Sequence, residues 1–95
     1  MKIGIIGAGK VGCSIGKYLT EHGFSVAGYC SKSKKSVEEA ATFTNTKAYD
    51  SLAELVAEST ILFLTTPDGA LESVWNELKK ESIQNKIVCH FSGSL

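Results

Sequence analysis

A glycine-rich hexapeptide near the amino terminus has the residue types and spacing that point most directly to chemistry. It reads Gly7-Ala8-Gly9-Lys10-Val11-Gly12 and follows the pattern G-x-G-x-x-G. In such a loop the first glycine permits a tight turn, the second lets a pyrophosphate approach the backbone, and the third lets the helix pack closely. The helix N-terminus then offers unpaired N–H groups and a positive dipole end to the anion. We therefore predict that all six residues bind the pyrophosphate of a dinucleotide.

The segments around the hexapeptide decide between this prediction and a turn that needs glycines for its shape alone. Lys2 to Ile6 is apolar enough for a short buried strand. Val11 to Glu21 has helical periodicity, with Gly23 as the expected C-terminal stop. The motif thus stands between a strand and a helix, which is the context that dinucleotide binding requires. A P-loop is excluded, because its G-x-x-x-x-G-K-[S/T] pattern does not occur.

A basic, hydroxyl-rich segment follows the second expected strand, Phe24 to Cys30, and bears on the choice of cofactor. NAD enzymes usually place Asp or Glu there, about 20 residues past the glycines, to hold the ribose 2′-hydroxyl. This sequence offers Ser31, Lys32 and Ser33 instead, with Lys35 close behind. Hydroxyl and ammonium groups bind a 2′-phosphate through charge-assisted hydrogen bonds. The predicted cofactor is therefore NADP rather than NAD, and the alternative is a solvated lysine surface.

Strands and helices alternate along the rest of the chain. The further expected strands are Thr46 to Tyr49, Thr60 to Thr65 and Lys86 to Phe91. The further expected helices start at capping boxes at Ser36 and Ser51, or carry the apolar stripe Leu71, Val74, Trp75 and Leu78. This alternation predicts an α/β fold, a Rossmann-like three-layer sandwich with a parallel sheet of about five strands in the order 3-2-1-4-5.

Two further loops are expected to border the cofactor at the carboxyl ends of the strands. Thr66 and Pro67, after the fourth strand, are predicted to touch the adenosine or pyrophosphate side. Asp68 reads more simply as the N-cap of the next helix. His90 and Ser92 follow the fifth strand, near a nicotinamide, but a packed histidine and a turn serine are the plainer reading. No catalytic residue is assigned, and no metal-ligand spacing is seen.

The composition narrows the class of protein. The 95 residues include ten lysines or arginines and ten acids, so the formal net charge is zero, which argues against nucleic-acid binding by bulk electrostatics. Three cysteines lie far apart and without a C-x-x-C pair, which fits reduced thiols: Cys13, Cys30 and Cys89. The sequence contains neither a signal peptide nor an apolar run of about 20 residues. We therefore expect a soluble cytoplasmic protein that binds no membrane.

The whole chain resembles the N-terminal domain of Rossmann-type NADP oxidoreductases. This group includes pyrroline-5-carboxylate reductase, deazaflavin-dependent NADP reductase and the β-hydroxyacid dehydrogenases, and the nearest resemblance is to a bacterial branch. The residues that carry it are Gly7 to Gly12, Cys30-Ser31-Lys32-Ser33, Thr66-Pro67-Asp68 and His90-Phe91-Ser92-Gly93. Lys32 stands where relatives often have arginine, which keeps the charge but loses the planar fork.

The resemblance implies the cofactor domain of an oxidoreductase that transfers a hydride to or from a small imine, ketone or hydroxy acid. In such proteins a mainly helical C-terminal domain completes the active site and usually forms a homodimer. Because the sequence stops at Leu95, just after the fifth strand, we expect residues 1–95 to be a truncated NAD(P)-binding domain that is inactive alone. The alternatives are a nucleotide-sensing regulatory module and a methyltransferase. Both tend to carry an acid on or just after the second strand, and this sequence has none at that strand's end.

Overall fold

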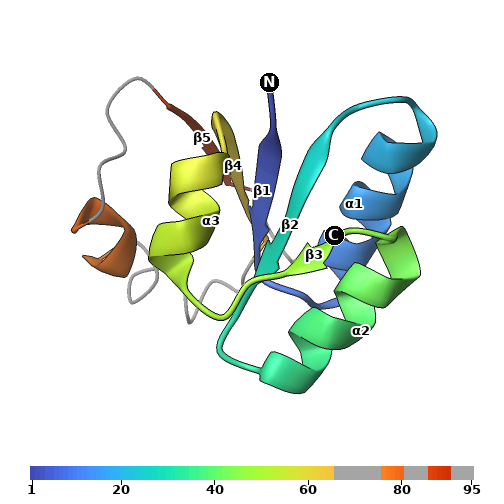
Figure 1. Ribbon diagram of the computed structural model, residues 1–95, viewed down its shortest axis with the longest axis horizontal. Coiled ribbons are helices and arrows are strands. Elements are labelled where there is room, and N and C mark those ends of the chain that lie inside the picture. The colour runs from blue at the N-terminus through green and yellow to red at the C-terminus, as the bar shows by residue number, and fades with distance from the viewer. Residues whose placement is uncertain (66–75, 81–85, 91–95) are drawn as a thin grey trace.

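A five-stranded parallel sheet with helices on both faces forms the framework of the computed structural model (Figure 1). The structure describes residues 1–65, 76–80 and 86–90. The strands are β1 (Ile3–Ile6), β2 (Val26–Cys30), β3 (Lys47–Ala48), β4 (Ile61–Leu64) and β5 (Ile87–His90). The helices are α1 (Lys10–Glu21), α2 (Lys34–Thr44) and α3 (Leu52–Glu58), and residues 76–79 are also helical. The strand order β3-β2-β1-β4-β5 confirms the predicted Rossmann-like topology.

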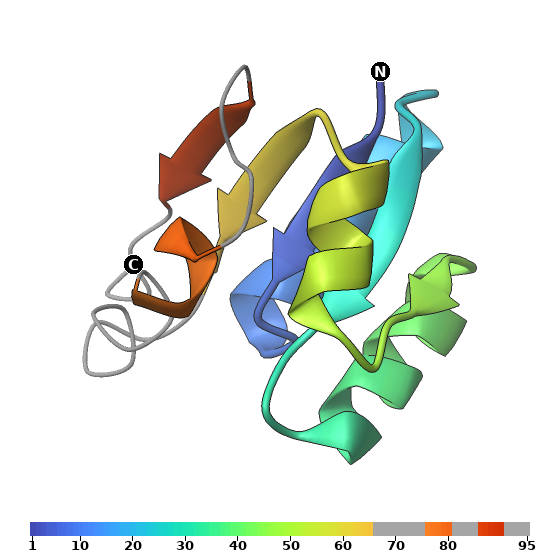
Figure 2. The ribbon, with the colours of Figure 1, turned by 60° about the vertical axis from the view of Figure 1, so that its left-hand side comes forward.

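The layers follow from the route of the chain across the sheet. Helices α1 and α2 cover one face, and α3 covers the other (Figures 1 and 2). After β3, at one edge, the chain crosses by α3 to β4, on the far side of β1. The strand order therefore reverses between β1 and β4. In open parallel sheets this switch point, at the carboxyl ends of the strands, is where ligands bind.

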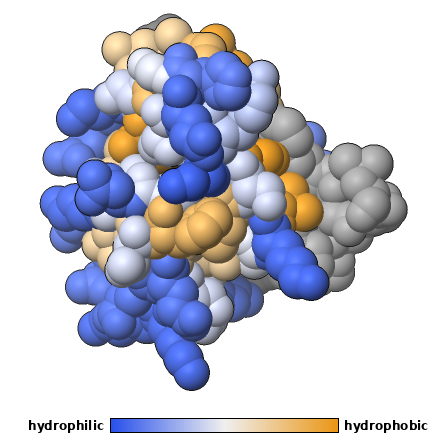
Figure 3. Space-filling model, turned by 90° about the vertical axis from the view of Figure 1, so that its right-hand side faces the viewer, coloured by the Kyte–Doolittle hydropathy of each residue, from blue (hydrophilic) through white to orange (hydrophobic). Residues whose placement is uncertain are grey.

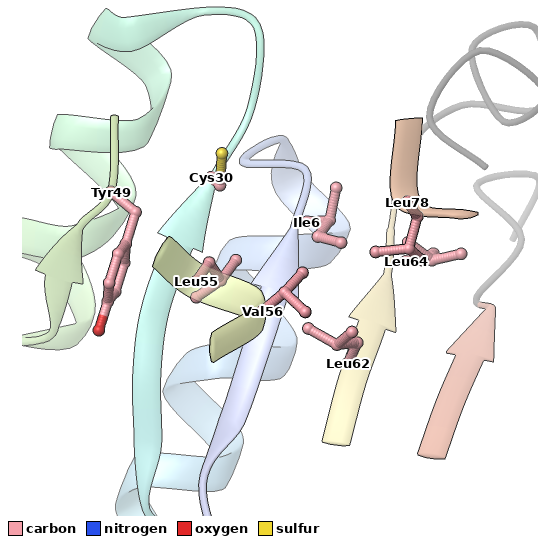
Figure 4. Packing of buried hydrophobic residues seen from close by; sticks show 8 residues of the cluster. All are labelled: Ile6, Cys30, Tyr49, Leu55, Val56, Leu62, Leu64 and Leu78. Atoms are coloured by element: carbon pink, nitrogen blue, oxygen red, sulfur yellow. The ribbon is translucent and has the colours of Figure 1, made fainter. Parts of the chain in front are cut away.

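Two apolar clusters, one on each face of the sheet, form the core. Because successive side chains of a strand point to opposite faces, Ile5 joins the cluster under α1 and α2, whereas Ile6 joins the cluster under α3. Buried members of the first cluster are Ile3, Ile5, Ala8, Tyr29, Val37 and Ala40. Buried members of the second, shown in Figure 4, are Ile6, Cys30, Tyr49, Leu55, Val56, Leu62, Leu64 and Leu78.

Helix α1 packs closely on the sheet because its inner face has no side chains at two positions. Gly12 and Gly16 are its buried residues, whereas the neighbouring apolar stripe through Ile15 is only half-buried. A Cβ on Gly16 would overlap the hydroxyl of Tyr29 and lie 2.8 Å from its Cζ. Tyr29 is fully buried in β2 and fills the space that Gly16 leaves.

Helix α1 ends as the sequence predicted, in a glycine-based stop. Gly23 has φ 82°, and the N–H of Phe24 donates to the carbonyl of Leu19 at 2.9 Å, which is the Schellman pattern. This turn occupies Phe24, which explains why β2 begins at Val26 and not at Phe24. The observed β3 and β4 are likewise one residue shorter at each end than predicted, and β5 begins one residue later, at Ile87.

The predicted start of α2 is wrong. The helix begins at Lys34, and its N-cap is Ser33, whose Oγ accepts the N–H of Ser36 at 3.3 Å. A good cap one turn before Ser36 extends the helix backward, so Lys34 and Lys35 are helical. At α3, Ser51 is the N-cap but its side chain makes no cap hydrogen bond, so the second predicted capping box is not formed.

Part of the predicted fourth helix lies outside the described residues, namely Leu71, Val74 and Trp75; Phe91 of the fifth strand does too. Leu78 is described and fully buried. Within residues 1–65, 76–80 and 86–90, no helix is long and apolar enough to cross a membrane.

The fit between Gly16 and Tyr29 can be tested by substitution. Overpacking a core costs about 1–3 kcal/mol, so we expect Gly16→Ala to lower the free energy of unfolding by about that amount. An alanine at an unhindered helical glycine would instead raise stability by about 0.5–1 kcal/mol. Urea denaturation measures the sign, and the double variant Gly16→Ala/Tyr29→Phe should recover part of the loss. A Gly16→Ala chain more stable than the parent would contradict the packing described.

Candidate cofactor-binding site

The turn after β1 is hydrogen-bonded to both neighbouring strands. Ile6 pairs with Cys30 of β2, and the N–H of Gly7 donates to the Cys30 carbonyl at 2.8 Å. On the other side, the N–H of Thr65 donates to the Ile6 carbonyl at 2.9 Å. The loop of the sequence motif therefore lies at the switch point of the sheet, at the carboxyl ends of β1, β2 and β4.

Two of the three motif glycines are required by the fold itself. Gly7 has φ 110°, a conformation that side chains disfavour. A Cβ on Gly12 would collide with the Gly7 carbonyl oxygen and lie 2.8 Å from Thr65 Oγ1. Both residues thus permit the tight turn and the close helix packing predicted from the sequence.

Gly9 is different, because nothing in the chain requires a glycine there. Its φ of −81° and ψ of −165° suit any residue, and a Cβ on it would meet no atom within 4 Å. It is the N-cap of α1 and is exposed, so the space above it is open. The glycine leaves room for a group that would approach the helix N-terminus from outside.

The first turn of α1 has the electrostatics of an anion site. No side chain caps the helix, and no acidic residue lies in its first turn. The N–H groups there and the positive end of the helix dipole favour an anion. The exposed ammonium group of Lys10 adds a full charge, whereas Ala8 is buried and Val11 is half-buried, so these two offer backbone more than side chain.

The segment after β2 forms a second helix start beside the first. Ser31 Oγ accepts the N–H of Ser33 at 3.1 Å, and Ser33 Oγ caps α2. A hydroxyl that accepts a hydrogen bond can still donate its own proton, so both serines can donate to a phosphate. Lys32 and Ser33 are exposed, and Ser31 is half-buried. The fold thus brings the three predicted residues to the carboxyl ends of the strands, where the glycine loop also lies.

Sequence reasoning missed a carboxylate near this segment. Asp50, in the loop after β3, lies 3.9 Å from the Lys34 ammonium group. Both side chains are strongly exposed, at 74% and 79%, so the pair contributes little to stability. It does offset one charge of the basic segment, and only the pairing of β3 beside β2 brings it there.

A groove between α1 and α2 continues from the glycine loop. Its lining residues are Ala8, Gly9, Lys10, Cys13, Ser14, Ser36, Glu39 and Phe43. Figure 3 shows this face, with apolar surface bounded by hydrophilic groups. Ser36, Glu39 and Phe43 recur at helical spacing and lie within the helix predicted from Ser36, but the sequence does not show that this face of α2 lies beside α1. Burial and, secondarily, Glu39 raise the pKa of the Cys13 thiol, which keeps it protonated at neutral pH.

Several predicted residues lie outside the described part of the chain: Thr66, Pro67, Asp68 and Ser92. His90 is described at the exposed end of β5. Within the described ranges, no group of His, Cys, Asp or Glu side chains could hold a metal ion.

Comparison with known proteins identifies the family. Residues 2–92 match the family described as NADP oxidoreductase, coenzyme F420-dependent. The chain belongs to this family. It is therefore a domain of the NAD(P)-dependent oxidoreductases. A comparison with curated proteins found no match.

Solved structures show the same fold for this oxidoreductase domain. Prephenate dehydrogenase from A. aeolicus, in complex with NAD+, has a TM-score of 0.81 at 18% identity and is matched over 97% of this chain and 33% of its own. Mycobacterium tuberculosis 3-hydroxyisobutyrate dehydrogenase has a TM-score of 0.77 at 20% identity, over 96% of this chain and 31% of its own. A reductive aminase from Aspergillus terreus in complex with NADPH has a TM-score of 0.77 at 16% identity, over 96% of this chain and 31% of its own. The oxidoreductase domain thus spans about a third of the length of these proteins.

A buried hydroxyl links β2 to the first turn of α1 in the oxidoreductase domain. The Tyr29 hydroxyl, on β2, donates to the Gly12 carbonyl of α1 at 2.8 Å. Burial raises the pKa of Tyr29 to about 12. The folded state therefore favours the protonated phenol. The contribution of the Tyr29 hydroxyl to the free energy of unfolding is fully present below the unfolded pKa of about 10. It is lost as the pH rises from there towards about 12, because the unfolded chain ionises first.

This linkage gives a pH-dependent prediction. Tyr29→Phe should lower the free energy of unfolding at pH 8 by about 1 kcal/mol, because one buried hydrogen bond is lost. The difference from the parent should then shrink between pH 10 and 12, where only the parent has Tyr29 to ionise. Urea denaturation of the two proteins at pH 8, 10 and 12 measures this difference in stability. Since lysine titration is common to both proteins, parallel pH profiles would contradict the assignment.

Proposed function

We propose that this chain binds NADP(H) as the cofactor domain of an oxidoreductase that passes a hydride to or from a small imine, ketone or hydroxy acid. The observation that carries the proposal is Gly9, a glycine that the fold does not need, at an uncapped helix N-terminus at the switch point. A pyrophosphate over Gly9 would use the open space, the helix N–H groups and Lys10.

The preference for NADP(H) over NAD(H) rests on the segment after β2. Ser31 and Ser33 are held by local hydrogen bonds with their own protons available, and Lys32 adds charge. A 2′-phosphate there would also face the N-terminus of α2, whose first turn contains no acidic residue. The Lys34–Asp50 pair weakens the local positive potential, so the proposed preference is moderate.

The chemistry would need more protein than this domain. The cofactor supplies the hydride chemistry when it is bound, and this domain would bind and orient it. We propose that a helical C-terminal domain completes the substrate site in the whole protein and forms a homodimer, and that the protein works in the cytoplasm. The structural relatives are about three times as long as this chain, which leaves room for such a domain.

Gly9→Val tests the pyrophosphate site directly. Its φ and ψ suit a β-branched residue and its Cβ meets no neighbour, so the fold should persist with a loss of no more than about 1 kcal/mol. The valine would occupy the approach of the pyrophosphate, and NADPH binding should be abolished, as measured by fluorescence titration.

Ala53→Val is the matched control, because it places the same exposed side chain on α3, across the sheet. It should bind NADPH as the parent does. Equal NADPH affinity in the parent and Gly9→Val would refute the assignment of the glycine loop.

Lys32→Ala tests the cofactor preference. A hydrogen bond to a charged group is worth about 1.5–3 kcal/mol, and an exposed one lies at the low end, so NADP(H) affinity should fall about tenfold. NAD(H) affinity should scarcely change, and rising salt should narrow the gap between the cofactors in the parent. Isothermal titration with both cofactors at two salt concentrations measures this.

Lys80→Ala is the control for charge alone, since Lys80 is also exposed but directly follows the helical residues 76–79, which pack through Leu78 on the face of the sheet that α3 covers. If the parent binds NAD(H) as tightly as NADP(H), or if both lysine variants behave alike, the solvated lysine surface is the correct reading.

A further inference from the structure

A buried threonine that directly follows β4, Thr65, contacts the start of the glycine loop. Thr65 is 6% exposed. Its Oγ1 donates to the Gly7 carbonyl at 3.1 Å and to the Ile6 carbonyl at 3.2 Å, and its N–H also donates to Ile6. One hydroxyl proton is thus shared between two successive carbonyls of the turn.

Both carbonyls belong to the turn that leads from β1 to α1. Ile6 ends β1, and Gly7 takes the left-handed conformation that aims the chain towards α1. The Gly7 N–H is already held by Cys30 of β2. The Thr65 hydroxyl therefore fixes the second polar group of the same residue from the opposite strand, and Gly7 is held on both sides.

The same hydroxyl also sets how close α1 comes to the sheet. It lies 2.8 Å from where a Cβ on Gly12 would be, so it fills the space under the first turn of the helix. Its contacts thus reach both ends of the Gly7–Gly12 segment. A serine-like hydroxyl is needed for the hydrogen bonds, whereas valine has the same shape without them.

We propose that Thr65 is a positioning residue for the pyrophosphate site: its hydroxyl holds the Gly7 turn and the α1 N-terminus in the geometry that receives the cofactor. This inference rests on the proposed dinucleotide function. Without the hydroxyl, a buried carbonyl loses a donor, and the turn must be ordered when the cofactor binds. A variant without the hydroxyl should therefore lose affinity for ligands that carry a pyrophosphate and keep its affinity for ligands that lack one.

The experiment compares Thr65→Val with Thr65→Ser in the 95-residue chain, using NADPH and adenosine 2′-monophosphate as probes. The second probe has the adenosine and 2′-phosphate but no pyrophosphate. In Thr65→Val, NADPH affinity should fall about tenfold, while the affinity for adenosine 2′-monophosphate should stay within about twofold of the parent. Thr65→Ser should restore NADPH binding. Should Thr65→Val not fold, Thr65→Ala removes the same hydroxyl without adding bulk.

Ser59→Ala is the matched structural control. Ser59 is also a buried residue whose hydroxyl donates to a carbonyl, that of Leu55, but it lies just before the amino end of β4, away from the glycine loop. The Ser59→Ala chain should melt at a lower temperature and bind both probes as the parent does. If Thr65→Val binds NADPH like the parent, or weakens both probes equally, the inference is overturned. A parent chain that binds no dinucleotide overturns the proposed function and this inference with it.

Discussion

The close contact of α1 with the sheet is the constraint on which the rest of the structure depends. Gly12 and Gly16 let the helix lie against β1 and β2 without intervening side chains, and Tyr29 fills the space that remains. This contact fixes the height of the α1 N-terminus over the strand ends, and hence the position of the glycine loop. Hydrogen bonds from β2 and β4 then hold Gly7 at the switch point. Packing and polar contacts thus act on the same few residues.

The motif glycines divide into those that the fold uses and one that it leaves open. Gly7 needs its positive φ, and Gly12 has no space for a Cβ, so either would be a glycine in a protein that bound nothing. Gly9 has an ordinary conformation and open space above it. The family match over residues 2–92 is consistent with this division, since its name implies a nicotinamide dinucleotide. The absence of acids from the first turns of α1 and α2 fits two phosphate groups at two helix starts.

Most of the topology could be predicted because local signals agreed with one another. The apolar runs, the Gly23 stop and the glycine motif all placed β1, α1 and β2 correctly to within two residues. The start of α2 could not be predicted, because Ser33 and Ser36 are both good caps three residues apart and only the structure shows which one accepts the hydrogen bond. Asp50 and Thr65 were missed for another reason. Their roles arise from strand pairing between segments distant in sequence, and no local pattern reports that pairing.

Amide chemical shifts of the ¹⁵N-labelled chain during titration with NADPH test the central claim most directly, because they report where the cofactor lies without any substitution. If the cofactor spans the two helix starts, the largest shifts will fall on Gly9, Lys10 and the segment Ser31–Ser33, and the amides of α3 will barely move. Saturating NADPH that leaves the glycine loop unshifted, or that perturbs α3 most strongly, would contradict the account.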